Sequence, residues 1–94
     1  MVRLVLSWNI KTEEETAYFE FVTQELLPAM LRLGLHPVEA WVTVYGSGPQ
    51  IIAPAEASDR ATLDAILQGD EWAALREKLD RFVTDFRQRV VERR

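Results

Sequence analysis

Few residues in this chain carry the side-chain chemistry of catalysis or ligand binding. His36, in the stretch LGLHPVE, is the single histidine among 94 residues, and imidazole is the side chain that normally titrates near neutral pH. It is interpreted either as a general base or ligand at the mouth of a cleft, or as a loop residue that caps the last carbonyls of a helix. The second interpretation is favoured, because a lone histidine has no catalytic partner at a matching spacing.

Two polar residues and several large aromatic residues complete the set of candidates. Arg3 and Asn9 are the stronger ligand candidates, because polar groups on a covered surface need hydrogen-bond partners; their alternative is exposure at the rim of a sheet. Large aromatic side chains with a polar atom are frequent in interfaces and pockets, although packing is their more common role. The candidate ligand-binding residues are therefore Arg3, Asn9, His36, Trp41, Tyr45 and Trp72, and no catalytic residue is assigned.

Several kinds of chemistry find no support in the sequence. The chain has no cysteine, so it can form neither a disulfide nor a thiolate metal site. Its carboxylates do not show metal-ligand spacing, and one histidine cannot support a Ser-His-Asp arrangement. The stretch GSGPQ lacks the Lys-Ser/Thr that completes a phosphate-binding loop. We expect no metal and no cofactor.

Length and composition indicate one globular domain covering residues 1–94. Hydrophobic residues make up 48% of the chain and charged residues 28%, which is ordinary for a folded domain. The net charge of −4 argues against nucleic-acid binding. No apolar run approaches the roughly 20 residues of a membrane-spanning helix, and the N-terminus lacks the features of a secretory signal. We expect no membrane association and a cytoplasmic location.

The first half of the chain predicts a strand and then a helix. VRLVLSWNI (residues 2–10) alternates apolar and mixed positions, as a strand with one buried face does. TEEE then predicts a helix start, with Thr12 as N-cap and Glu15 as its capping-box partner. Pro28 should kink this helix or begin a second segment, and Gly34 is a natural C-cap.

The second half predicts two strands, a split helix and an ambiguous C-terminus. VEAWVTVY and QIIAPAE are the strands, and Pro54 indicates an edge or a strand end. One helix follows after a cap at Ser58 or Asp59 and ends at Gly69, and Asp70 caps the next. Residues 83–94 either prolong the last helix, which periodicity favours through Phe86, or turn back as a fourth strand. The order β-α-β-β-α-(β) predicts an α+β ferredoxin-like sandwich, with an antiparallel sheet and helices on one face.

The predicted sheet has apolar side chains on both faces. In the strand VEAWVTVY the small aliphatic residues face the helices, whereas Trp41 and Tyr45 face away. Covering a second face of roughly 350 Å², if it is mostly apolar, contributes on the order of 5–9 kcal/mol, against an association cost of about 4–15 kcal/mol. We therefore predict a homodimer with sheets packed face to face, in which strand edges and helix ends also contribute to the interface.

The element order, the two-faced strands and the split second helix resemble the ferredoxin-like dimeric α/β-barrel superfamily. Within it, SWNI at the end of the first strand and GDEWAAL in the last helix look most like small antibiotic-biosynthesis-type and haem-degrading monooxygenases, and like NIPSNAP-type domains. The resemblance implies that Asn9 and Trp72 match an asparagine and a tryptophan used by the haem-degrading members. Their histidine is missing after Trp72, which argues against haem binding.

Three functions follow as hypotheses. The leading one is a homodimer of unassigned activity that binds a small hydrophobic or aromatic molecule in a cleft lined by Asn9, Trp41, Tyr45 and Trp72. The second, which the resemblance implies, is a cofactor-independent monooxygenase of the antibiotic-biosynthesis type; such chemistry needs little from the protein beyond orienting and deprotonating its substrate. The third is a structural or regulatory module whose sheet is purely an interface.

Overall fold

The computed structural model describes residues 1–38, 42–43 and 51–92. Helices and strands alternate along it in the order expected of a ferredoxin-like domain. Their bounds are β1 Val2–Ile10, α1 Glu15–Phe21, the π-helical segment η1 Val22–Leu26, α2 Leu27–Leu33, β2 His36–Pro37, β3 Val42–Thr43, β4 Ile51–Ala57, α3 Arg60–Leu67, α4 Asp70–Leu79 and β5 Val83–Glu92.

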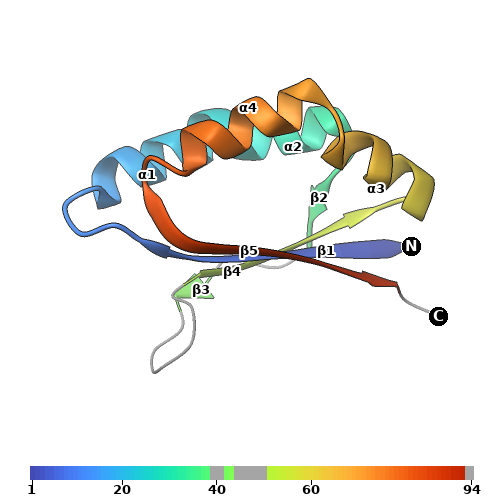
Figure 1. Cartoon of the computed structure of the whole chain (residues 1–94), viewed down its shortest axis with the longest axis horizontal. Coiled ribbons are helices and arrows are strands. Elements are labelled where there is room, and N and C mark those ends of the chain that lie inside the picture. Colours follow the sequence, from blue (N-terminus) through green and yellow to red (C-terminus); the bar gives the residue numbers. More distant parts are fainter. Residues whose placement is uncertain (39–41, 44–50, 93–94) are drawn as a thin grey trace.

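The strands form one antiparallel sheet, and the helices cover one face of it (Figure 1). The strand order is β2-β4-β1-β5, and the short β3 also pairs with β4. The N-terminus and the end of β5 lie at the same end of the sheet (Figure 1). This arrangement confirms the predicted α+β ferredoxin-like fold with helices on one face.

The core lies between the helices and the inner face of β1 and β4. Val2, Leu4, Leu6 and Trp8 alternate along β1 and are each at most 4% exposed, whereas the residues between them are partly exposed. Successive side chains of a strand point to opposite faces, so the alternation in the sequence fixes which face of β1 the helices cover. The neighbouring strand β4 contributes alanines and Ile51 to the same core.

The C-terminal segment is a strand, so the helix that periodicity favoured through Phe86 is wrong. Helix α4 ends at Leu79, and β5 then pairs antiparallel with β1 from Val83 onward. Between the pairs Ser7–Arg87 and Asn9–Thr84, a bulge sets two residues of β5, Asp85 and Phe86, against one residue of β1, Trp8. A bulge of this kind shifts the alternation by one residue. Both Val83 and Phe86 therefore reach the core, and this spacing of three imitates a helical stripe.

The first helix begins later than the sequence predicts. Residues 12–13 form a turn with Glu13 at φ 73°, and Glu14 precedes the helix without a side-chain capping bond. The predicted capping box of Thr12 and Glu15 is therefore wrong. The backbone N–H of Lys11 bonds to the carbonyl of Phe82 at 2.8 Å, which ties the chain to the α4–β5 turn before the helix can start.

Pro28 and Gly34 act as predicted. The helix widens into η1 before Pro28, where the N–H of Leu27 bonds to the carbonyl of Val22, five residues back. This widening accommodates proline, which lacks an N–H and whose ring crowds the carbonyl four residues earlier. Gly34 ends α2 at φ 101°, a left-handed conformation that glycine adopts without a steric penalty.

Pro54 lies in the interior of the sheet, so its predicted position on an edge strand or at a strand end is wrong. Its strand, β4, lies between β1 and the segments β2 and β3. The carbonyl of Pro54 accepts from the N–H of Val38 at 3.3 Å, just beyond the end of β2 at Pro37. Because β2 stops here, proline can supply an acceptor without the donor that a longer ladder would need.

Helix α3 begins as the sequence indicates, whereas the predicted cap of α4 is wrong: Gly69 is its N-cap, without a side-chain capping bond, and Asp70 is its first residue. Asp59 caps α3 by accepting from the backbone N–H of Thr62 at 2.7 Å, and this bond lowers the pKa of the Asp59 carboxyl. Within the described ranges, no helix is both long enough and apolar enough to cross a membrane.

Candidate functional site

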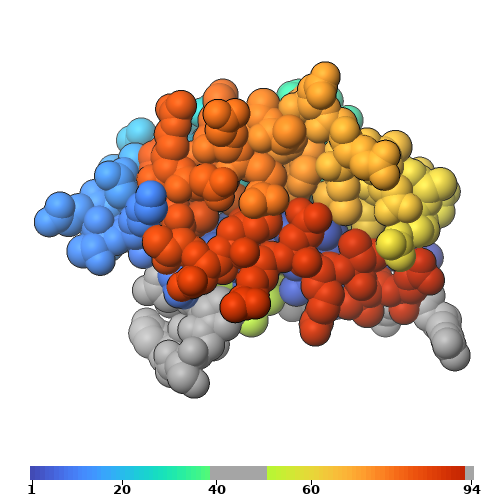
Figure 2. Space-filling model, in the orientation of Figure 1, coloured from blue at the N-terminus to red at the C-terminus, as the bar shows by residue number. Residues whose placement is uncertain are grey.

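The sheet face that the helices do not cover, called here the open face, carries a mixed set of side chains. Its rows follow from the strand register, because directly paired residues in an antiparallel sheet project to the same side. One row is His36, Glu56, Arg3 and Val91; the next is Pro54, Val5 and Arg89; a third contains Ile52, Ser7 and Arg87. In the orientation of Figures 1 and 2 the helices lie above the sheet and the open face points down.

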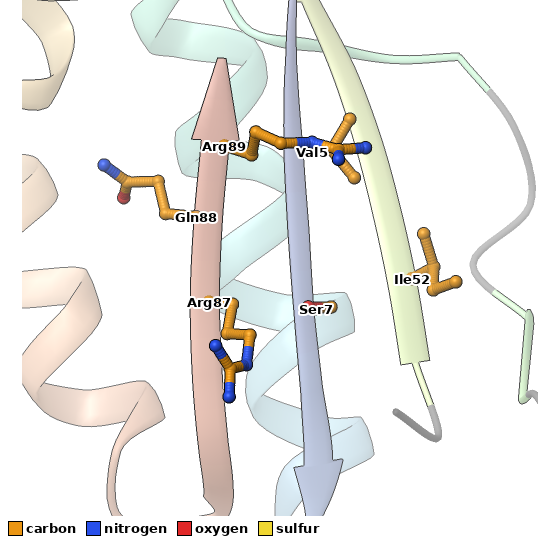
Figure 3. A pocket seen from close by; sticks show the side chains of 6 residues that line it. All are labelled: Val5, Ser7, Ile52, Arg87, Gln88 and Arg89. Carbon is orange, nitrogen blue, oxygen red and sulfur yellow. The ribbon is translucent and has the colours of Figure 1, made fainter. Parts of the chain in front are cut away.

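The middle of the open face is concave. A cavity of about 590 Å³, called here the open-face pocket, is lined by Val5, Ser7, Ile52, Arg87, Gln88 and Arg89. Figure 3 shows the Arg89 side chain extending across β1 towards Val5, whereas Gln88 points to the far side of β5. Small-molecule sites occupy about 300–1,000 Å³ and combine apolar walls with a few polar groups. The open-face pocket has this size and this composition.

The charge around the open-face pocket is positive. Arg3 forms an ion pair with Glu56 across the strands, with the Nη2–Oε2 distance at 3.4 Å. Arg87 and Arg89 form no ion pair with any residue that the structure describes. Among the described residues, these two arginines on adjacent rows of the open face locally reverse the net charge of −4 that the whole chain carries.

The structure brings two of the predicted site residues into one row. His36 lies in β2 opposite Glu56, and Arg3 lies in β1 opposite the same Glu56. His36 is exposed and belongs to a short strand, rather than to the loop that the sequence suggested. The row His36–Glu56–Arg3 borders the open-face pocket, so these residues lie at its rim and not in its lining.

Asn9 lies at the opposite end of β1 from Arg3, about 20 Å away at the usual rise of a strand. Its side-chain amide donates to the carboxylate of Asp85 at 3.1 Å. Asp85 is the extra residue of the β5 bulge and has φ 56°. This contact gives Asn9 a role in holding the bulge, and the open-face pocket lies between Asn9 and Arg3.

Trp72 lies on the other side of the sheet from the open-face pocket. It is 4% exposed and belongs to the core beneath α4. It also lines a second cavity of about 390 Å³ beside α4, together with Arg76, Glu77 and Asp80. The structure therefore does not bring Trp72 into a common cleft with Arg3 or Asn9. Trp41 and Tyr45 lie outside the described residues. The described part of their strand contradicts the predicted facing: Val42, which was expected to face the helices, pairs with Ile52 of the open face, and Thr43 pairs with the buried Ile51.

An aromatic cluster packs against the face of the sheet that the helices cover. The Trp8 indole N–H donates to the Tyr18 hydroxyl at 2.9 Å, and Trp8 stacks on Phe86 with ring centroids 6.0 Å apart. The Arg76 guanidinium lies 3.7 Å above the Phe86 ring centroid. Burial raises the pKa of Tyr18 to about 12, and the bond from Trp8 only partly opposes this rise. Tyr18 is thus a neutral core residue at physiological pH.

Sequence reasoning missed the residues that line the open-face pocket. No role is predicted for Arg87 and Arg89 from the sequence, because residues 83–94 fit either a helix or a strand. The spacing of the two arginines in RQR could have indicated the pocket, because residues two positions apart in a strand project to the same face of the sheet. Val5 and Ile52 were recognised as strand residues but not as the floor of a pocket.

Comparisons with known proteins support the fold. No protein-family model matches the sequence, and no curated protein matches it either. Solved structures do match: an uncharacterised NIPSNAP domain protein from Burkholderia xenovorans has a TM-score of 0.72 at 10% identity, with 100% of this chain and 95% of that chain covered. An antibiotic biosynthesis monooxygenase has a TM-score of 0.73 at 16% identity, with coverages of 99% and 98%.

A third structure, an ethyl tert-butyl ether d (EthD) family protein from Bacillus halodurans, has a TM-score of 0.72 at 15% identity and full coverage of both chains. At such identities the likeness concerns the fold and not the activity. The chain therefore has the ferredoxin-like α+β fold shared by NIPSNAP domain proteins and antibiotic biosynthesis monooxygenase-like proteins.

Proposed function

We propose that this protein is a homodimer whose two open faces pack against each other and enclose a site for a small hydrophobic or aromatic molecule. The observation that carries the proposal is the open-face pocket, whose floor is formed by Val5 and Ile52 on a face that no helix covers. A second copy would shelter both apolar floors at once, because a twofold axis uses the same surface on both subunits.

The energetics of such a dimer depend on more than the pocket. A mostly apolar face would contribute on the order of 5–9 kcal/mol, and the charged residues of the open face reduce this, whereas association costs about 4–15 kcal/mol. Val91 at the edge strand is 37% exposed and shares a row with Arg3. In the proposed dimer this edge adds apolar area to the interface.

The first test places a charge on the proposed interface. Val5→Glu should convert the dimer into a folded monomer, because Val5 lies outside the helix-covered core and a carboxylate would be buried against its symmetry mate. Leu31→Glu is the matched control, because Leu31 is 52% exposed on α2, on the helical side. Size-exclusion chromatography with light scattering at micromolar concentration measures the masses, and circular dichroism reports folding. A monomeric wild-type protein would overturn the dimer.

The cofactor-independent monooxygenase has weaker support. The solved structure that carries this name shares 16% identity with the chain. The two residues that the resemblance would use lie apart: Asn9 bonds to the bulge at the end of β1, and Trp72 is buried beneath α4. A purely structural module remains the alternative reading of a dimer that binds no ligand.

A further inference from the structure

The open-face pocket contains two cationic groups, Arg87 and Arg89, that form no ion pair within the part of the chain that the structure describes. Arg87 and Arg89 alternate with Gln88 on β5, so their Cα atoms are about 6.7 Å apart on the same face. Neither forms an ion pair with any of the described residues, and both line the pocket. The carboxylate on the adjoining row, Glu56, is already paired with Arg3.

We propose that the molecule bound in the open-face pocket is an aromatic or aliphatic carboxylate, whose anionic group is held by Arg87 and Arg89 and whose apolar body lies on Val5 and Ile52. This inference rests on the proposed function and names its ligand class. A guanidinium presents paired N–H donors that match a carboxylate in two parallel hydrogen bonds. A neutral apolar ligand would bury the two cations without compensation, which is unfavourable.

The geometry separates the two halves of such a ligand. Arg89 reaches across β1 towards Val5, and Arg87 lies one row further along β5 beside Ser7 (Figure 3). Ile52 lies on β4, on the other side of β1 from these arginines. A flat ligand lying across the three strands would therefore place its carboxylate between the Arg87 side chain beside β5 and the Arg89 guanidinium near Val5, and its apolar end over Ile52 on β4. Ser7, in the middle, adds one hydroxyl that can donate to it.

The test uses two probes of the same shape and different charge, 2-naphthoate and 2-naphthamide, titrated into the full-length protein by calorimetry. We expect the acid to bind at least tenfold more tightly than the amide, the low end of what a charge-assisted hydrogen bond contributes. Arg87→Gln and Arg89→Gln should each remove most of this difference. Arg89→Lys should keep part of it, because lysine retains the charge without the fork. Arg81→Gln, in the turn after α4, is the matched control and should change nothing.

The outcomes separate this inference from the proposed function. Equal binding of acid and amide would overturn the carboxylate and leave the apolar site in place. If neither probe binds at millimolar concentration, both the carboxylate ligand and the proposed site for a small hydrophobic or aromatic molecule are overturned. Light scattering would still show whether the protein is a dimer. If Arg87→Gln or Arg89→Gln dissociates the dimer, the arginines pair with carboxylates of the second copy, and the inference is overturned.

Discussion

Trp8 and Tyr18 depend on each other at the level of single residues. Each is at most 1% exposed, and the indole N–H has the tyrosine hydroxyl as its acceptor at 2.9 Å. A buried donor without an acceptor loses the full free energy of its hydration. The tyrosine hydroxyl is thus the group that allows a tryptophan to occupy the centre of this small core.

Tyr18→Phe should lower the free energy of unfolding by about 1–3 kcal/mol at pH 8, because it removes the buried hydroxyl that accepts from the Trp8 N–H. The difference should shrink at alkaline pH. Burial raises the pKa of Tyr18 from 10.0 to about 12, so the wild-type protein is fully stabilised below pH 10 and loses stability as pH rises from about 10 to about 12. At pH 11 this loss is on the order of 1 kcal/mol.

Urea unfolding of both proteins at pH 8 and pH 11 measures this change. Phenylalanine does not ionise, so the variant lacks the alkaline loss that belongs to Tyr18. A stability difference that is the same at both pH values would contradict the raised pKa.

Among the elements, β5 owes its register to a single bulge. Asp85 has φ 56°, and its carboxylate accepts from Asn9 at 3.1 Å. The extra residue lets Val83 and Phe86 both face the core and leaves Arg87 and Arg89 on the open face. The pocket arginines are therefore placed by the bulge as much as by their own positions in the sequence.

Asp85→Val should destabilise the protein by about 1–3 kcal/mol, because a β-branched residue is strained at positive φ. Asp85→Gly, the matched variant, also loses the contact with Asn9 but tolerates the backbone conformation. Denaturant unfolding of the two variants separates strain from the lost hydrogen bond. Equal destabilisation by valine and glycine would show that the contact with Asn9, and not the backbone, holds the bulge.

The same elements show what a sequence can predict. The alternation in β1 was sufficient to predict that strand, and the glycine after Leu33 was sufficient to predict the end of α2. Strand periodicity and left-handed caps are local properties of a sequence. The bulge was not predictable: residues spaced by three, such as Val83 and Phe86, satisfy either a helix or a bulged strand. The prediction that Pro54 lies at an edge was also wrong because a distant element decides it. An interior strand tolerates this proline only because β2 ends at Pro37, next to it. The candidate site was the least predictable part, since only the register of β5 against β1 places Arg87 and Arg89 on the open face.

For the whole molecule, the question is whether folding and assembly are one equilibrium. If the proposed dimer forms, unfolding of two subunits is coupled to dissociation, and stability rises with protein concentration. Raising the concentration from 1 to 100 μM should then raise the melting temperature by several degrees, since a hundredfold change corresponds to about 2.7 kcal/mol.

Differential scanning calorimetry at the two concentrations measures this shift. The Val5→Glu variant provides the reference, because a monomer unfolds at a temperature that does not depend on its concentration. A wild-type melting temperature that stays constant over this range would contradict coupled folding and assembly.

The π-helical segment η1 has a consequence for chain length. A five-residue turn is a four-residue turn with one residue added, and η1 holds this addition where Thr23, Gln24 and Glu25 are exposed. Losing one of them would restore ordinary helical spacing without rotating the buried faces of α1 and α2 against each other. It would also remove the space that the ring of Pro28 occupies. Length and proline content are therefore coupled here: a shorter version of this helix should be tolerated only if residue 28 changes as well.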